Sequence, residues 1–440
     1  MISLFITIQT LDSQEGDRII RKVYVRILPF IFILYMINYI DRVNLGFAAL
    51  TMNPDLGITP VAFGIVSGVF FIGYIIFEYP SNRLMERLGA RIWLPRILIS
   101  WGLVVVLLSC VTSAFDVGIL RFLLGLAEAG FYPGIVLYLS YWLRHQDMAR
   151  ALSYVLAAPM IALIIGAPVS TLILDHVNWF GIASWRWLFV AEGLPAIILG
   201  IVTSLYLDNS PRDAGWLSSG EKEWLAETIK KEKESDGKPE QKPLMFFFRQ
   251  VWFHRLWIVY SLAMCSLYAI VFWLPQQVQS FHITSSLLQI GLISAVPYVV
   301  AFFCMLIWAH HSDATKERRY HLIIPFACSA LGFLGDALAS NPIHALAFMS
   351  IAIAGLYSAF PVLWALVAER MSRVDASGGV ALVSSLGCIG GFIGPFLMGV
   401  FVQSSGGVDA VPAFITLASF MVIAILLVQY DFQVKAGTRY

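Results

Sequence analysis

Long apolar stretches recur along the chain and alternate with short polar segments. A helix needs about 20 predominantly apolar residues to cross a lipid bilayer, and twelve stretches reach that length. They lie near 25–47, 61–82, 93–113, 117–141, 150–173, 186–207, 256–279, 287–309, 320–339, 344–368, 378–402 and 409–429. The pattern predicts an all-α polytopic membrane protein with twelve transmembrane helices in two six-helix halves.

The polar segment 208–254 divides the twelve predicted spans into six and six. We therefore expect an N-terminal segment (1–23), a six-helix bundle (24–207), a linker loop with a short helix (208–254), a second bundle (255–429) and a tail (430–440). The halves share a weak repeat, because 81–91 and 311–319 both read as short turns in which acids precede bases. Repeated six-span halves are typical of secondary transporters, whose substrate sites lie between the halves near the bilayer midplane.

Composition supports a membrane protein: 59% of the 440 residues are hydrophobic and 13% are charged, against about 25% charged in soluble domains. The net charge of +1 is distributed over several loops, so nucleic-acid binding is not expected. The five cysteines stand singly within apolar runs, which indicates neither a disulfide framework nor a metal site. Residues 1–11 lack a basic leader and a cleavage site, so we expect no signal peptide.

The basic residues predict the orientation in the membrane. Of the 29 Lys and Arg, only Arg42, Arg121 and Arg186 fall outside one set of segments: the N-terminal segment, the tail and the loops that follow even-numbered spans. Since basic loops face the cytoplasm, both termini are predicted to be cytoplasmic, with the chain in the inner or plasma membrane. The alternation also supports the count of twelve spans, because a misplaced span would disrupt it.

Four charged residues lie inside the predicted first and fourth spans. Asp41 and Arg42 are adjacent in the first, and Arg121 and Glu128 are seven residues apart on one face of the fourth. Charges at membrane depth cost a few kcal/mol on insertion scales and mark functional sites by default. We expect the four to line one cavity in the outer half of the membrane. The alternative is two structural ion pairs, Asp41–Arg42 and Arg121–Glu128.

Other polar and aromatic residues within the spans are candidates for the same pocket. In the first half they are Tyr35, Asn38, Tyr39 and Tyr74. In the second half they are Tyr268, Trp273, Tyr357 and Trp364, as an aromatic wall. Helix packing and the interfacial aromatic belt are the alternatives. Glu78 is expected to be a gate or packing residue, and Arg186 and Glu192 an interfacial structural pair. Histidines on the predicted loops are expected to be solvated, and no histidine pair within a span indicates a metal.

Several motifs, in order along the chain, resemble the major facilitator superfamily and, within it, the anion:cation symporter family. They are YIDRVN at 39–44, FEYPSN at 77–82, RFLLGLAEAGFYPG at 121–134, WRWLF at 185–189 and FWLP at 272–275. The acid-x₄-Arg turn of Glu86 and Arg91 resembles the superfamily's loop motif, with Glu where Asp is usual. The family includes bacterial permeases for tartrate, hydroxyphenylacetate, phthalate and sugar acids.

The resemblance implies proton-driven uptake of a small organic anion. It implies that Asp41 and Glu128 carry protons and that Arg42 and Arg121 bind the anion. It also implies a cytoplasmic latch made by loop charges, here Glu86, Arg87, Arg91 and Asp313. Ser384 and Cys388 stand where relatives often carry asparagines in the eleventh span, which favours an aromatic or less hydroxylated carboxylate over a sugar acid.

The leading prediction is a secondary active transporter that couples protons to carboxylate uptake by alternating access. An exchanger or facilitator for similar anions is the alternative, although span 5 carries only part of the antiporter pattern, in Gly166-Ala167-Pro168. A membrane sensor or enzyme is a further class, against which stands the lack of a nucleotide-binding loop or a catalytic triad pattern. We expect no cofactor beyond the proton as coupling ion, a monomer, and the organic anion and lipid bilayer as partners.

Overall fold

A computed structural model describes residues 2–235, 244–371, 376–406 and 410–437. Within these ranges twelve spans are long and apolar enough to cross a membrane, which confirms the predicted fold class. The predicted tail extends to residue 440, and 438–440 lie outside the described residues.

The spans of the first half are α1 (Ile2–Leu56), α2 (Pro60–Leu88), α3 (Ala90–Leu108), α4 (Ala114–Glu128) with α5 (Phe131–Leu139), α6 (His145–His176) and α7 (Ser184–Tyr206). Those of the second half are α10 (Val251–Ser280), α11 (Leu287–Thr315), α12 (Arg319–Ala337), α13 (Pro342–Met371), α14 (Ala376–Ser404) and α15 (Val411–Gly437). Short helices lie between spans: η1 (Trp179–Gly181), η2 (Pro211–Asp213), α8 (Ser219–Ser235) and α9 (Leu244–Phe248).

Local sequence signals explain where several helices begin and end. The hydroxyls of Thr59 and Ser113 accept hydrogen bonds from backbone N–H groups in the first turns of α2 and α4, as N-caps do. Gly89 ends α2 at φ +81°, and Gly130 divides the fourth span at φ +83°. These left-handed conformations favour glycine because it has no Cβ atom.

The two segments predicted as short turns are mostly helical. Residues 81–88 form the last two turns of α2, and only Gly89 separates α2 from α3. Residues 311–315 likewise complete α11 before a turn at 316–318. The expectation of turns was wrong because charges at a helix end that emerges from the bilayer are compatible with helix.

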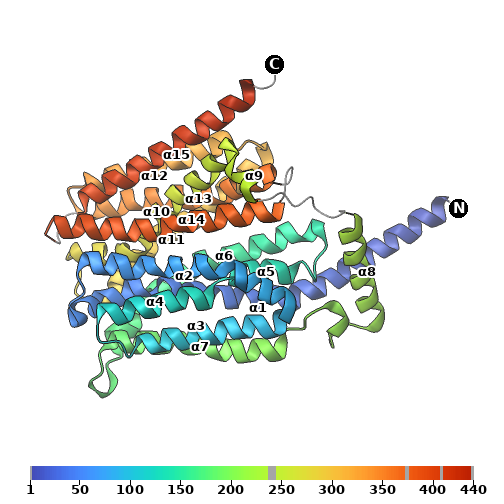
Figure 1. Ribbon diagram of the computed structural model, residues 1–440, viewed down its shortest axis with the longest axis horizontal. Helices are drawn as coiled ribbons and strands as arrows, with labels where there is room; N and C mark the ends of the chain where they lie inside the picture. The colour runs from blue at the N-terminus through green and yellow to red at the C-terminus, as the bar shows by residue number, and fades with distance from the viewer. Residues whose placement is uncertain (1, 236–243, 372–375, 407–409, 438–440) are drawn as a thin grey trace.

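The helices form two groups, with N-terminal helices on one side and C-terminal helices on the other (Figure 1). We call the end at which α8 and the N-terminus lie the α8 end, and the opposite end the far end. The two groups diverge toward the α8 end. Toward the far end α1 meets α10 closely: a Cβ on Gly46 would lie 3.0 Å from the carbonyl oxygen of Val271.

Polar contacts also join the halves at the far end. The carboxylate of Asp175, on α6, accepts hydrogen bonds from Ser286 Oγ (2.8 Å) and Leu288 N (3.2 Å) at the start of α11. Gln403 on α14 accepts one from the backbone N–H of Val61 on α2, at 3.1 Å. Side chains from opposite halves therefore seal the far end.

The linker helix α8 docks on the first half. Lys22 of α1 forms an ion pair with Glu221 of α8, and this hydrogen bond holds the pKa of Glu221 below its ordinary range. The rings of Trp142 and Trp216 stack with centroids 5.5 Å apart. Both contacts tie the linker to the N-terminal six helices.

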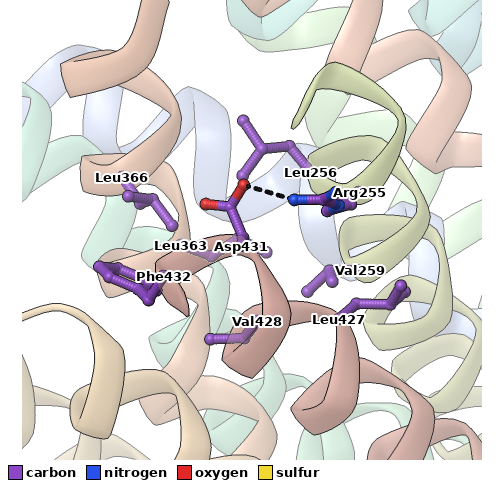
Figure 2. Close-up of a pocket in the computed structure, with 9 residues that line it drawn as sticks. All are labelled: Arg255, Leu256, Val259, Leu363, Leu366, Leu427, Val428, Asp431 and Phe432. Carbon is purple, nitrogen blue, oxygen red and sulfur yellow. Dashed lines mark ion pairs between the residues drawn. The ribbon is translucent and has the colours of Figure 1, made fainter. Parts of the chain in front are cut away.

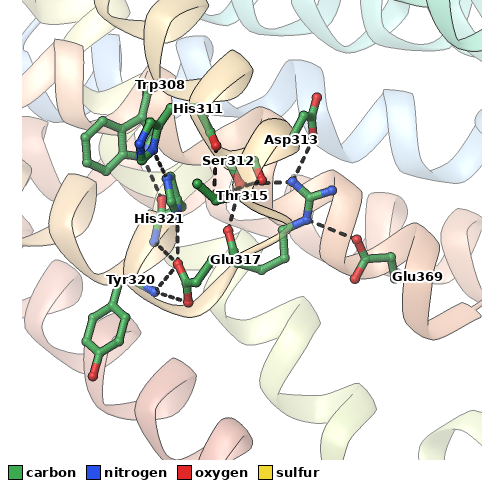
Figure 3. Close-up of polar contacts among 10 residues, drawn as sticks. Trp308, His311, Ser312, Asp313, Thr315, Glu317, Tyr320, His321 and Glu369 are labelled. Atoms are coloured by element: carbon green, nitrogen blue, oxygen red, sulfur yellow. Dashed lines mark hydrogen bonds and ion pairs between the residues drawn. The ribbon is translucent and has the colours of Figure 1, made fainter.

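A second polar network lies at the α8 end of the C-terminal half (Figure 3). His321 is 6% exposed; its Nε2 lies 2.7 Å from Nδ1 of His311, and its Nδ1 lies 2.7 Å from Oε2 of Glu317. The expectation that these histidines are solvated was therefore wrong for His321, because α12 begins two residues before it and turns it inward. Burial alone would raise the pKa of Glu317, but the bonds from His321 and from backbone N–H groups outweigh it and lower that pKa.

Candidate functional site

The centre of the site is an ion pair between spans of the first half. Arg42 Nε on α1 donates to Glu128 Oε1 on α4 at 2.7 Å, and Arg42 Nη2 donates to the same oxygen. The Glu128 side chain is fully buried, and that of Arg42 is 12% exposed. Glu128 Oε2 has no hydrogen-bond partner among the described residues. The arginine therefore neutralises the acid but uses only one of its two oxygens.

Arg121 is a buried cation without an acid partner. Its side chain is fully buried, and none of its three guanidinium nitrogens has a hydrogen-bond partner among the described residues. It lies against aromatic rings of both halves, with Cζ 5.0 Å from the Phe70 centroid and 5.6 Å from that of Phe272. Cation–π contacts offset part of the cost of burying the charge. Five N–H donors in a planar fork remain available, the geometry that matches a carboxylate.

Asp41 occupies a different place from its neighbour Arg42. Its Oδ2 accepts a hydrogen bond of 2.9 Å from Nε1 of Trp101, on α3, and its side chain is fully buried within the first half. The alternative of two structural ion pairs, Asp41–Arg42 and Arg121–Glu128, was wrong, because Arg42 pairs with Glu128 and Asp41 accepts from Trp101. Adjacent residues of a helix point about 100° apart, so Asp41 and Arg42 face different neighbours.

Tyrosines surround the Arg42–Glu128 pair. The guanidinium of Arg42 lies 5.8 Å from the ring centroid of Tyr39 and 5.3 Å from that of Tyr74. Tyr268, from α10 of the other half, packs edge-on against Phe71 at 4.4 Å. Tyr39 and Tyr74 therefore lie around the cation, and Tyr268 packs on α2 from the other half.

The other predicted pocket residues are buried, except Trp364, which is half-buried. Tyr35 stacks on Tyr132, with centroids 5.5 Å apart. Trp273 packs edge-on against Phe63, and Trp364 against Tyr260. Three predicted residues have buried polar atoms with no hydrogen-bond partner among the described residues: Asn38, Trp273 and Tyr357. These atoms are candidates for contact with a polar ligand.

The eleventh span also meets the second through a polar contact between two side chains. Ser385 Oγ donates to Glu78 Oε2 at 2.7 Å, which joins α14 to α2 across the two halves. Cys388 is buried one turn farther along α14, whereas the predicted Ser384 is half-buried. Glu78 thus binds Ser385, the residue next to the predicted Ser384.

The predicted gating charges make local contacts. Glu86 pairs with Arg83 at 3.2 Å within α2, and Arg87 is exposed. Arg91 Nε donates to the carbonyl of Ser204 on α7. In the other half Arg318 binds both Asp313 (2.7 Å) and Glu369 (3.0 Å), as Figure 3 shows. Each of these contacts stays within its own half.

A small recess within the C-terminal half is a separate feature (Figure 2). Its wall is mostly leucine and valine from α10, α13 and α15. Asp431 at its edge pairs with Arg255 at 3.5 Å and also with Arg370. The acid is thus neutralised by two arginines, so this recess serves to fasten three helices and offers no free charge to an anion.

Sequence reasoning missed several residues of the site. Trp101, Phe70 and Phe272 look like packing residues in a single sequence, yet they contact Asp41 or Arg121. The predicted Arg186–Glu192 pair was wrong: Arg186 binds the carbonyls of Ser109 and Val111. Ser170 Oγ instead donates to Glu192 at 2.6 Å inside the first half. The only sequence signal for this buried contact was that Glu192 is a charged residue inside an apolar run.

Comparison with known proteins identifies the family. The family model described as Major Facilitator Superfamily matches residues 31–375. The chain belongs to the major facilitator superfamily. It is 38% identical over 396 residues to a "Putative tartrate transporter" of Agrobacterium vitis, covering 90% of this chain and 91% of that protein. It is 34% identical over 415 residues to a quinolone resistance transporter of Acinetobacter baumannii, covering 94% and 95%.

A solved structure shares the superfamily fold. A bacterial homologue of the human lysosomal transporter Spinster, in an inward-facing and occupied conformation, superimposes with a TM-score of 0.75 at 16% identity. The alignment covers 95% of this chain and 98% of that one. The assignment made from the sequence motifs is confirmed at the level of the superfamily. The protein is therefore a multi-pass membrane transporter rather than an enzyme.

Proposed function

We propose that this superfamily member is a secondary active transporter that takes up a small organic carboxylate together with protons, by alternating access. The observation that carries the proposal is the buried Arg42–Glu128 pair beside the unpartnered Arg121. The buried site thereby offers two cations to an anion and one acid to a proton.

Competition for Arg42 provides the coupling. Arg42 stabilises the ionised form of Glu128, since an opposite charge favours ionisation. A substrate carboxylate that binds Arg121 and Arg42 competes with Glu128 for the guanidinium. Once released, the buried acid lacks a cation and takes up a proton. Anion binding and protonation of Glu128 therefore favour each other reciprocally, as thermodynamic linkage requires. We propose Asp41 as a second proton carrier.

The aromatic side chains around the site favour a carboxylate with apolar or aromatic surface. Tyr39, Tyr74 and Tyr268 supply faces on which a planar ligand can pack, and Ser384 and Cys388 supply no amide. One relative is named for tartrate, so dicarboxylates belong in any substrate panel. Arg121 would bind the first carboxylate, and the unpartnered Trp273 and Tyr357 are candidates to contact the rest of the ligand.

The described contacts support a state closed to the outside. Positively charged loops lie at the α8 end, so we propose that this end and both termini are cytoplasmic and that the protein resides in the inner membrane. The far end, where Asp175 binds Ser286, is then the sealed outer side. Segments 24–207 and 255–429 would rock about the site, with 208–254 as linker. Release of Glu78 from Ser385 would accompany opening between α2 and α14.

Uptake into proteoliposomes tests this function. Purified protein is reconstituted, test substrates such as tartrate and benzoate are supplied outside, and an inward proton gradient is imposed. Accumulation above equilibrium that disappears with a protonophore is the expected result. Equilibration without accumulation would indicate a facilitator, and flux only against a preloaded anion would indicate an exchanger. Absence of carboxylate flux would contradict the substrate class.

A further inference from the structure

A second group of buried polar side chains lies within the first half, apart from the arginines. Asp41 on α1 accepts from Trp101 on α3 at 2.9 Å. Glu192 on α7 accepts from Ser170 on α6 at 2.6 Å. The exposed fractions of Asp41 and Glu192 are 0% and 6%. Four helices thus contribute to one polar cluster in a segment that crosses the membrane.

The cluster contains polar atoms that the fold leaves without partners. Among the described residues, Asp41 Oδ1 has no hydrogen-bond partner, and Glu192 Oε2 has none besides the side-chain amide of Asn44. Asn44 is 1% exposed, lies three residues after Asp41 on the same face of α1, and neighbours Glu192. A buried polar group without a partner is costly, and native proteins keep such groups mainly where they serve a function.

The charges in this region are all acidic. Neither Asp41 nor Glu192 forms an ion pair with any described residue, and the ionisable groups that act most strongly on Asp41 are Glu192 and Glu128. An unpaired carboxylate in a low-dielectric interior is expensive, so at least one of two neighbouring acids retains a proton. Glu192, Asp41 and Glu128 therefore form a series of acids that ends at Arg42.

We propose that Glu192 is a positioning and proton-relay residue that delivers protons to Asp41 from the outer part of the first half. The proposal rests on the proposed function. Glu192 lies about two turns from the start of α7 at the far end. A proton passes from Glu192 to ionised Asp41, and Glu192 regains one from the outer side. Asp41 then protonates Glu128 when an anion has taken Arg42.

The same arrangement prevents a proton leak. In the anion-free state Arg42 neutralises ionised Glu128, so the relay stops at Asp41. The path also lies inside one half rather than between the halves, so rocking of the halves does not break it. A purely structural role, in which Glu192 only fastens α6 to α7 through Ser170, is the competing explanation.

Glu192→Gln distinguishes these roles because its amide oxygen still accepts the bond from Ser170, whereas it cannot carry a proton. Two fluxes of radiolabelled tartrate into proteoliposomes are compared: accumulation driven by a proton gradient, and counterflow against preloaded tartrate, which requires no net proton movement. We expect gradient-driven accumulation to fall by at least about tenfold with counterflow unchanged. Glu192→Asp should restore part of the accumulation.

Asp336→Asn is the matched control, because Asp336 is a buried acid of the other half that accepts from Gln277 at 2.8 Å. It should leave both fluxes unchanged. Unaltered accumulation in Glu192→Gln, or an equal loss of both fluxes, would overturn the relay.

Infrared spectroscopy of the purified protein needs no substrate. The relay predicts an infrared band from a protonated carboxyl group at neutral pH in the wild-type protein. Glu192→Gln should shift this band, and the shift should be absent when Asp41→Asn is also present. If the wild-type protein carries neither tartrate nor benzoate, the proposed function is at fault, and this spectrum still decides the relay: independent bands, or none, would refute it.

Discussion

Replacing Glu128 by glutamine should tighten anion binding. In the structure Arg42 Nε lies 2.7 Å from Glu128 Oε1, so an arriving carboxylate must displace a buried charge-assisted hydrogen bond. Such bonds contribute about 1.5–3 kcal/mol. The glutamine oxygen still accepts a neutral bond, so we count the loss of one charged bond. At about 1.4 kcal/mol per tenfold, the affinity should rise roughly tenfold to a hundredfold.

Titration calorimetry measures this on purified protein, with the carboxylate that most stabilises it in a thermal-shift screen. The variants are compared at about pH 7, where simple carboxylates are ionised. Glu128→Gln should bind the anion more tightly than the wild-type protein, because its amide carries no charge for Arg42 to neutralise. Asp336→Asn should retain the wild-type affinity. Equal or weaker binding by Glu128→Gln would refute the competition between substrate and Glu128.

Three other substitutions test separate parts of the account. Arg121→Lys should weaken anion binding about tenfold in the same calorimetry without lowering Tm, because Arg121 makes no hydrogen bond to the described residues; a large fall in Tm would mean a structural role. Gly46→Leu should destabilise the conformation with a closed far end by about 1–3 kcal/mol, because the leucine side chain would overlap Val271. A reporter cysteine at the far end should therefore react faster with a membrane-impermeant maleimide. Glu317→Gln should lower Tm at about pH 7, and the difference should shrink as pH falls below the ordinary glutamate pKa of about 4.3: the folded pKa of Glu317 is depressed, so its stabilisation exists above its ordinary pKa and is lost as pH falls through the folded value.

The helices followed from the sequence because apolar length is a strong and local signal. All twelve predicted spans correspond to helices of the structure, although α1 extends well beyond 25–47 at both ends. Residues 12–18 of the extension at its start are polar, and Gly16 there lies against Trp224 of α8. Hydropathy marks the part of a helix inside the bilayer and says nothing of the part outside it.

The partners of the buried charges did not follow from the sequence. Spacing placed Arg121 and Glu128 on one face of the fourth span, but spacing alone does not show whether they pair with each other. Their pairing depends on the rotation of α1 against α4, which packing of both halves determines. That rotation brings Arg42 to Glu128 and turns Asp41 toward Trp101.

Contacts between the two halves could not be predicted from the sequence either. Ser385 rather than Ser384 reaches Glu78 because adjacent residues of α14 point in different directions. The aromatic neighbours of Arg121 come from α2 and α10, and no single-sequence pattern distinguishes such rings from ordinary packing. Buried polar residues within spans were the useful signal, and their partners required the fold.

The central claim is that the anion and the proton enter together through competition for Arg42. The most direct measurement is the external pH of weakly buffered proteoliposomes when tartrate or benzoate is added without an imposed gradient. We predict that anion addition makes the outside more alkaline, and that Glu128→Gln abolishes this change while counterflow persists. Anion entry without alkalinisation in the wild-type protein would contradict the claim.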